Sequence, residues 1–126
     1  MKKQIEQVKE FNKVFGIEHN NTPTLILKEE WMLRYGLMEE ELNEYYDACW
    51  DENLTEVADA LGDMLYILCG TILAHGMQDK ITEVFNEIHR SNMSKIEDGV
   101  VLRRADNKIL KGKYYFKPNI KAILNK

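Results

Sequence analysis

The chain has 126 residues, 30% of them charged, and a formal net charge of −4. This length predicts one domain, and the negative charge disfavours a nucleic-acid-binding protein. The N-terminal MKKQIEQVKE has no apolar run behind its lysines, and polar residues interrupt every longer apolar stretch. We therefore expect a cytoplasmic protein without a signal peptide or a membrane partner, with Cys49 and Cys69 reduced.

The first half of the chain predicts two helices. Apolar residues at steps of three and four predict a helix over residues 3–15, ended by Gly16. Asn, Thr and Pro mark residues 17–24 as a loop. The same apolar periodicity then predicts a second, long helix from about Pro23 to Ala48.

Two further helices follow. Asn53 and Glu56 form a capping-box-like pair that begins a third helix, and Gly76 ends it. Apolar residues on one face predict a fourth helix over about 79–95. The expected fold is all-α, with a four-helix core of antiparallel helices.

The last part of the chain has a different pattern. It alternates loosely, and Asp106 and Asn107 lie between two short apolar runs, which predicts a hairpin-like or irregular tail. The final ten residues predict a short last helix. We expect one domain over 1–126, with a helical core at 1–97 and a tail at 98–126.

Acidic residues gather in MEEELNEYYDA, residues 38–48. Glu41 and Glu44 are three apart, so they share one helix face. Glu56 and Asp59 have the same spacing on the third helix. The connection between the two helices is short, which makes them antiparallel neighbours, so the two pairs can face each other.

Such a set of carboxylates needs a counter-charge. Two carboxylates 4 Å apart repel by about 4 kcal/mol at an effective dielectric of 20. Oxygen-only ligands favour Mg²⁺ or Mn²⁺. The alternative is an acidic helix face exposed to solvent. Val57 and Leu61 show that the second acidic pair borders an apolar face, but spacing alone leaves both interpretations open.

These acidic motifs carry a resemblance. EELNE fits Glu-Glu-x-x-Glu and EVAD fits Glu-x-x-Asp, and together they resemble the all-α nucleotide pyrophosphohydrolases, which include MazG, dimeric dUTPases and phosphoribosyl-ATP pyrophosphohydrolase. VKEFNKVFG, EIHRSNMSK and ADNKILKGKYYFKPNI are similar to a MazG-like, phosphoribosyl-ATP-pyrophosphohydrolase-like branch. Asn12 stands where His is frequent in that branch, and Asn107 where Gly is frequent.

The resemblance implies Mg²⁺-dependent hydrolysis of a nucleoside triphosphate to a monophosphate and pyrophosphate, with Mn²⁺ as a substitute metal. Glu40 is the implied catalytic base or water-positioning group, and Asp63 is a further candidate for a contact with the metal. The implied metal ligands are Glu41, Glu44, Glu56 and Asp59. The implied substrate-binding residues are Asn92, Lys95, Lys108 and Lys111. Trp31 and Tyr35 are candidates for contact with the base of the nucleotide.

The resemblance leaves alternatives within and outside this activity. Nucleotide-pool housekeeping is the favoured role, and hydrolysis of phosphoribosyl-ATP in histidine synthesis is the second. A non-catalytic helical module that binds a nucleotide or a protein is the alternative from another class. The family pattern also implies a homodimer or homotetramer.

Overall fold

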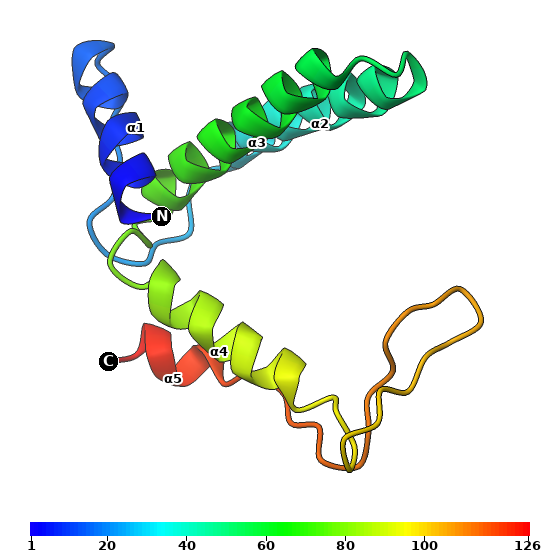
Figure 1. Ribbon diagram of the computed structural model, residues 1–126. Helices are drawn as coiled ribbons and strands as arrows, with labels where there is room; N and C mark the ends of the chain where they lie inside the picture. Colours follow the sequence, from blue (N-terminus) through cyan, green and yellow to red (C-terminus); the bar gives the residue numbers. More distant parts are fainter. The chain divides into compact units, whose positions relative to one another are not determined.

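A computed structural model describes all residues, 1–126, and contains five helices and no strands. The predicted all-α class and the short last helix are confirmed. The chain forms two compact units, Met1–Asp79 and Lys80–Lys126, and each is described by itself (Figure 1).

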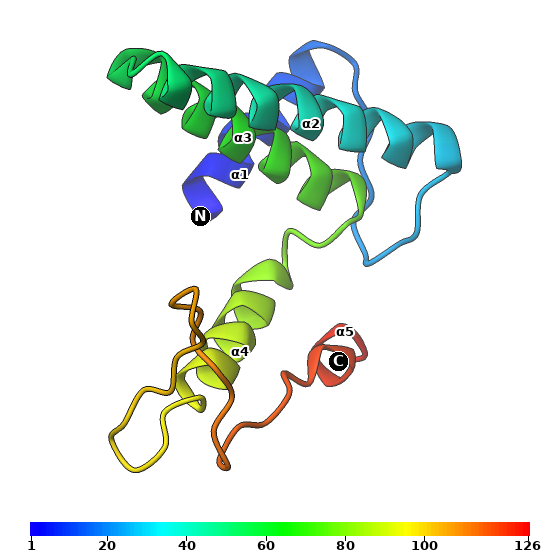
Figure 2. The same ribbon diagram turned by 90° about the vertical axis from the view of Figure 1, so that its right-hand side faces the viewer.

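The first unit consists of α1 (Lys2–Val14), α2 (Lys28–Trp50) and α3 (Leu54–Ala74), and α3 packs against both other helices. Helices α2 and α3 run antiparallel side by side, joined by only three residues (Figures 1 and 2). On α1, Ile5 and Val8 are buried, as the apolar periodicity predicts. The short connection fixes which ends of α2 and α3 meet.

The start of α2 differs from the prediction. The sequence predicts a helix from about Pro23, but α2 begins at Lys28 because the preceding residues bond elsewhere. The backbone N–H of Thr24 donates to the carbonyl of His75 at 2.9 Å, beyond the end of α3. Leu27 is still extended, with φ −64° and ψ 154°. The loop therefore satisfies backbone groups near the end of α3 before α2 can start.

Both ends of α3 follow from local chemistry. The side chain of Asn53 accepts a hydrogen bond from the Glu56 N–H at 3.2 Å, which confirms the predicted cap. At the other end Gly76 has φ +67°, a left-handed conformation that favours glycine. A Cβ at Gly76 would also collide with the backbone of Thr22. A glycine is therefore needed where the loop crosses the helix end.

Helix α3 is strongly apolar. An 18-residue window of it has a mean hydropathy of 1.6, so by length and composition it resembles a membrane span, a test that core helices also pass. Contacts with α1 and α2 account for part of this character. A further row of leucines stays exposed and is called the leucine stripe. Its members are Leu54, Leu61, Leu65 and Leu68, which are 81%, 50%, 37% and 42% exposed.

The second unit is built around α4 (Ile81–Met93) and α5 (Ile120–Leu124), which pack together. Ser91 is buried on α4, and its hydroxyl donates to the carbonyl of Phe116 at 2.8 Å. Ile123 on α5 is buried as well. The end of the chain is therefore a packing partner of α4.

Between α4 and α5 the chain forms a hairpin-like excursion. Isolated antiparallel bridges join Glu97 to Val100 and Arg103 to Ile109. Asn107 at its tip has φ +71°. Asparagine tolerates this left-handed conformation better than most residues, which suits it to the tip of the excursion.

Candidate metal centre

Three carboxylates converge between α2 and α3. Glu41 and Glu44 come from neighbouring turns of α2, and Asp63 comes from α3. One oxygen atom from each lies within 4.8 Å of the others. Helical spacing places the two glutamates on one face, and the antiparallel pairing brings the aspartate opposite them. This is an arrangement that a divalent cation can bridge.

The electrostatics of this group call for a positive charge. The Oε2 atom of Glu41 is buried and has no hydrogen-bond partner. Burial, followed by the hydrogen bond and charge of Glu44 and the charges of Asp63 and Asp59, raises the pKa of Glu41 to about 7. Burial, then the charges of Asp59 and Glu44, also raises the pKa of Asp63.

An unpartnered buried oxygen among carboxylates fits a hard cation. Mg²⁺ and Mn²⁺ take oxygen ligands, and a bound cation would favour the ionised carboxylates that burial disfavours. The residues present therefore fit the divalent metal that the acidic motifs imply. Glu41, Glu44 and Asp63 would hold it.

The predicted ligands are not all equally placed. Glu41 and Glu44 lie in the cluster. Asp59 is exposed but close enough for its charge to raise the pKa of both Glu41 and Asp63. Glu56, one turn earlier on α3, is exposed and outside the three-residue cluster. Asp63, which the sequence suggests only as a further candidate, has a more central position than Glu56.

Glu40 lies next to the cluster in sequence and is exposed. It belongs to none of the ion pairs of the protein. On an α-helix its side chain is rotated by about 100° from that of Glu41. This position leaves Glu40 outside the metal ligands, as its predicted role requires, and that role stays a prediction.

The aromatic candidates for base binding lie nearer the start of α2. Trp31 and Tyr35 are one turn apart and are 45% and 66% exposed. The hydroxyl of Tyr35 donates to Glu39 Oε2 at 3.1 Å. Both rings therefore present free surface, and their contact with a base stays a prediction.

The predicted phosphate-binding residues belong to the second unit. Asn92 and Lys95 lie at and just after the end of α4, and Lys108 and Lys111 lie in the tail. The ammonium of Lys111 lies 4.8 Å from the ring centroid of Tyr115. Their role toward a substrate remains a prediction.

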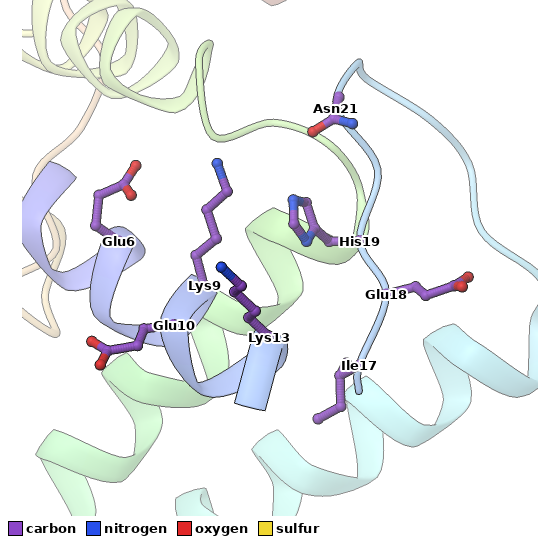
Figure 3. A pocket seen from close by; sticks show the side chains of 8 residues that line it. All are labelled: Glu6, Lys9, Glu10, Lys13, Ile17, Glu18, His19 and Asn21. Carbon is purple, nitrogen blue, oxygen red and sulfur yellow. The ribbon is translucent and has the colours of Figure 1, made fainter. Parts of the chain in front are cut away.

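A cavity of about 590 Å³ opens between α1 and the following loop (Figure 3). In Figure 3 the amino groups of Lys9 and Lys13 and the ring of His19 lie at its centre, and Glu18 points to one side. Carboxylates and amines alternate in its lining, so it offers no single charge to select an ion. None of the clustered acids lines it. The lining residues are Glu6, Lys9, Glu10, Lys13, Ile17, Glu18, His19 and Asn21.

Known proteins provide two comparisons. Residues 8–92 match the family model described as phosphoribosyl-ATP pyrophosphohydrolase, which covers more than half of the chain and includes all the acidic motifs. The chain is also 38% identical over 69 residues to an uncharacterized protein of Acanthamoeba polyphaga mimivirus. That match covers 52% of this chain and 28% of the viral protein, so the chain spans well under half of that relative.

Proposed function

Because the chain belongs to the phosphoribosyl-ATP pyrophosphohydrolase family, in the MazG-like nucleotide pyrophosphohydrolase superfamily, we propose that it hydrolyses a nucleoside triphosphate to a monophosphate and pyrophosphate. One observation supports this most directly. Glu41, Glu44 and Asp63 converge, and an oxygen of Glu41 is buried without a partner. A divalent metal at such a place would neutralise charge on the phosphates of a substrate, and Mg²⁺ is the proposed ion, with Mn²⁺ as a substitute.

The proposed roles divide the acids into two groups. A bound Mg²⁺ would neutralise charge on the phosphate oxygens and lower the pKa of a water molecule. Glu41, Glu44 and Asp63 would hold the ion, with Asp59 and Glu56 as the remaining carboxylates of the motif. Glu40, beside the ligands but not among them, orients the attacking water and accepts its proton.

Exposed aromatic, amide and basic side chains are the proposed contacts to the substrate. Trp31 and Tyr35 are exposed aromatic side chains on the same helix as the glutamates and offer flat apolar surface to a base. The proposed donors to the phosphates are Asn92, Lys95, Lys108 and Lys111.

The family description supports a second substrate. Phosphoribosyl-ATP also carries a triphosphate chain, and its hydrolysis would use the same acids. Nucleotide-pool housekeeping in the cytoplasm is the favoured role, since the acidic centre itself requires only a triphosphate.

We further propose a homodimer in which the leucine stripe of α3 is covered. Its spacing alternates between three and four residues from Leu61 to Leu68, which is the spacing of a helix–helix seam. Between 37% and 81% of the surface of each of these leucines stays exposed in the single chain.

Product identification tests the proposal. Nucleoside triphosphates and phosphoribosyl-ATP are incubated separately with the protein and Mg²⁺, and the products are separated by ion-exchange chromatography. We expect a monophosphate and pyrophosphate from at least one substrate, and no turnover by the matched Glu44→Gln variant. Release of orthophosphate and a diphosphate by the wild type would contradict the proposal, as would equal turnover by the variant.

A further inference from the structure

Arg34 on α2 is a half-buried cation without an acidic partner. None of the ion pairs of the protein includes it. Its Nε donates to Thr71 Oγ1 at 3.0 Å, and its Nη2 donates to the carbonyl of Ile67 at 2.9 Å. Both acceptors are neutral and lie on α3. Burial lowers the pKa of Arg34, so an arginine is a costly choice at this position unless its directed bonds serve a purpose.

The opposite helix is shaped to admit this guanidinium. Gly70 is buried on α3, and a Cβ there would lie 2.5 Å from Nη2 of Arg34. Thr71, next to it, donates to the Ile67 carbonyl at 2.9 Å, so the two acceptors are themselves joined. A glycine inside a helix weakens that helix, and here it provides the space in which the guanidinium lies.

These two bonds are the only side-chain hydrogen bonds between α2 and α3. The remaining contacts between these helices are packing contacts, which many neighbouring arrangements can satisfy. About two turns further along α2, the clustered carboxylates Glu41, Glu44 and Asp63 repel one another across the same helix pair. Arg34 therefore supplies the directional link between two helices whose facing carboxylates repel each other.

The hydrogen bonds of Arg34 and the clustered carboxylates depend on the same alignment of α2 against α3. Arg34 precedes Glu41 by seven residues, which is about two turns on the same face of α2. On the antiparallel α3, Ile67 follows Asp63 by four residues, about one turn. A slip along the helices that broke the Arg34 bonds would also carry Asp63 away from the glutamates.

We infer that Arg34 is a positioning residue that holds α2 and α3 in the register in which Glu41 and Glu44 face Asp63. Gly70 is its counterpart, because it leaves room for the guanidinium. This inference rests on the proposed metal-dependent function. It assigns no contact with the substrate to Arg34.

The test compares Gly70→Ala with Gly36→Ala by Mg²⁺ titration calorimetry of the folded chain. Both variants add one methyl group inside a helix, but only Gly70 faces Arg34, and a Cβ at Gly36 meets nothing within 4 Å. We expect Gly70→Ala to weaken Mg²⁺ binding about 10-fold or more, the usual effect of losing a group that orients metal ligands. We expect Gly36→Ala to keep the wild-type Kd.

A double-mutant cycle shows whether Gly70 acts through Arg34. Arg34→Met alone is expected to weaken Mg²⁺ binding as Gly70→Ala does. Adding Gly70→Ala to Arg34→Met is expected to cause little further loss, because the group with which the methyl collides is gone. Fully additive losses would overturn the assignment. Thr71→Val, which removes the Oγ1 hydroxyl but leaves the bond from Arg34 to the Ile67 carbonyl possible, provides a milder variant if the others fold poorly.

The outcomes separate this inference from the proposed function. If the wild type binds Mg²⁺ and the Gly70→Ala and Thr71→Val chains melt earlier with an unchanged Kd, Arg34 only stabilises the fold, and the positioning role is wrong. If the folded wild type binds no Mg²⁺ at all, the proposed function fails and this inference fails with it.

Discussion

Glu41 combines burial with neighbouring negative charge, and this makes stability depend on pH. Its pKa rises from an ordinary 4.5 to about 7. Between these values the folded chain binds the proton more tightly than the unfolded chain. The contribution of Glu41 to the free energy of unfolding is therefore full below pH 4.5 and is lost as pH rises toward 7.

We expect the Glu41→Gln variant to gain stability relative to the wild type as pH rises from 4.5 to 7 without added metal. The neutral amide keeps the shape of the side chain but cannot ionise. Urea unfolding at several pH values measures this difference, and groups that do not interact with Glu41 cancel in it. A difference that stays constant with pH would contradict the assignment. Saturating Mg²⁺ is expected to reduce the difference, since the cation favours the ionised carboxylate.

Glu40 and Glu44 have different proposed roles, so we expect replacement by glutamine to have a different effect at each position. Glu44→Gln removes a proposed metal ligand, so we expect Mg²⁺ affinity and turnover both to fall. Glu40→Gln leaves the clustered oxygens intact, so Mg²⁺ affinity stays close to wild type while turnover falls about 10²–10⁴-fold. Calorimetry and turnover numbers at saturating Mg²⁺ check both. Recovery of the Glu40→Gln enzyme by excess Mg²⁺ would make Glu40 a ligand instead of the base.

For single residues, the sequence predicts which side chains share a helix face better than it predicts which side chains they meet on another helix. The spacing of Glu41 and Glu44 predicts a shared face, and the structure brings them together. The central position of Asp63 relative to Glu56 depends on how far the two helices slide along each other, which spacing alone does not determine. The position of Arg34 between the helices cannot be predicted from the sequence, because a single arginine on a long helix is most often a solvent-exposed side chain.

Among the elements, the tail divides into two parts with different tasks. Residues 112–126 pack on α4 through Phe116 and Ile123, whereas the hairpin over 103–109 forms bonds mainly with itself. Cutting the chain after Gly99 would remove both parts. A shorter deletion is therefore needed to test the hairpin alone.

We expect replacement of residues 103–109 by a two-residue Asn-Gly turn to leave the helices folded and to weaken nucleotide affinity. The replacement removes Lys108, a proposed phosphate donor, but retains the partners of α4. Circular dichroism measures the helices, and calorimetry with a non-hydrolysable triphosphate measures the affinity. Lys108→Ala in the intact chain is the matched control and is expected to account for part of the loss. Unchanged affinity in both variants would remove Lys108 from the site.

Element boundaries show where local signals are insufficient. Asn53 and Gly76 bound α3 as predicted, because their effect depends on nearby backbone. The predicted start of α2 is five residues too early because Thr24 forms a hydrogen bond with His75, which is 51 positions away. No local pattern around Pro23 contains that information. Boundaries set by distant partners therefore need a structure.

For the whole molecule, the leucine stripe predicts self-association. We expect the wild type to sediment as a dimer and Leu61→Lys to sediment as a monomer, because a charge in an apolar helix seam is costly to bury. Analytical ultracentrifugation at several concentrations measures this. Val14→Lys on α1, at a side chain that is 72% exposed, is the matched control and is expected to stay dimeric. A monomeric wild type would contradict the proposed dimer.

The three-residue connection between α2 and α3 keeps the clustered carboxylates within one short stretch of the chain. All three clustered carboxylates lie between positions 41 and 63, inside one helical hairpin. Closing so short a loop costs little chain entropy, so the two helices meet at a low entropic cost. The three clustered carboxylates thus belong to one contiguous segment of the chain. Extra segments can be added before or after it without separating its members.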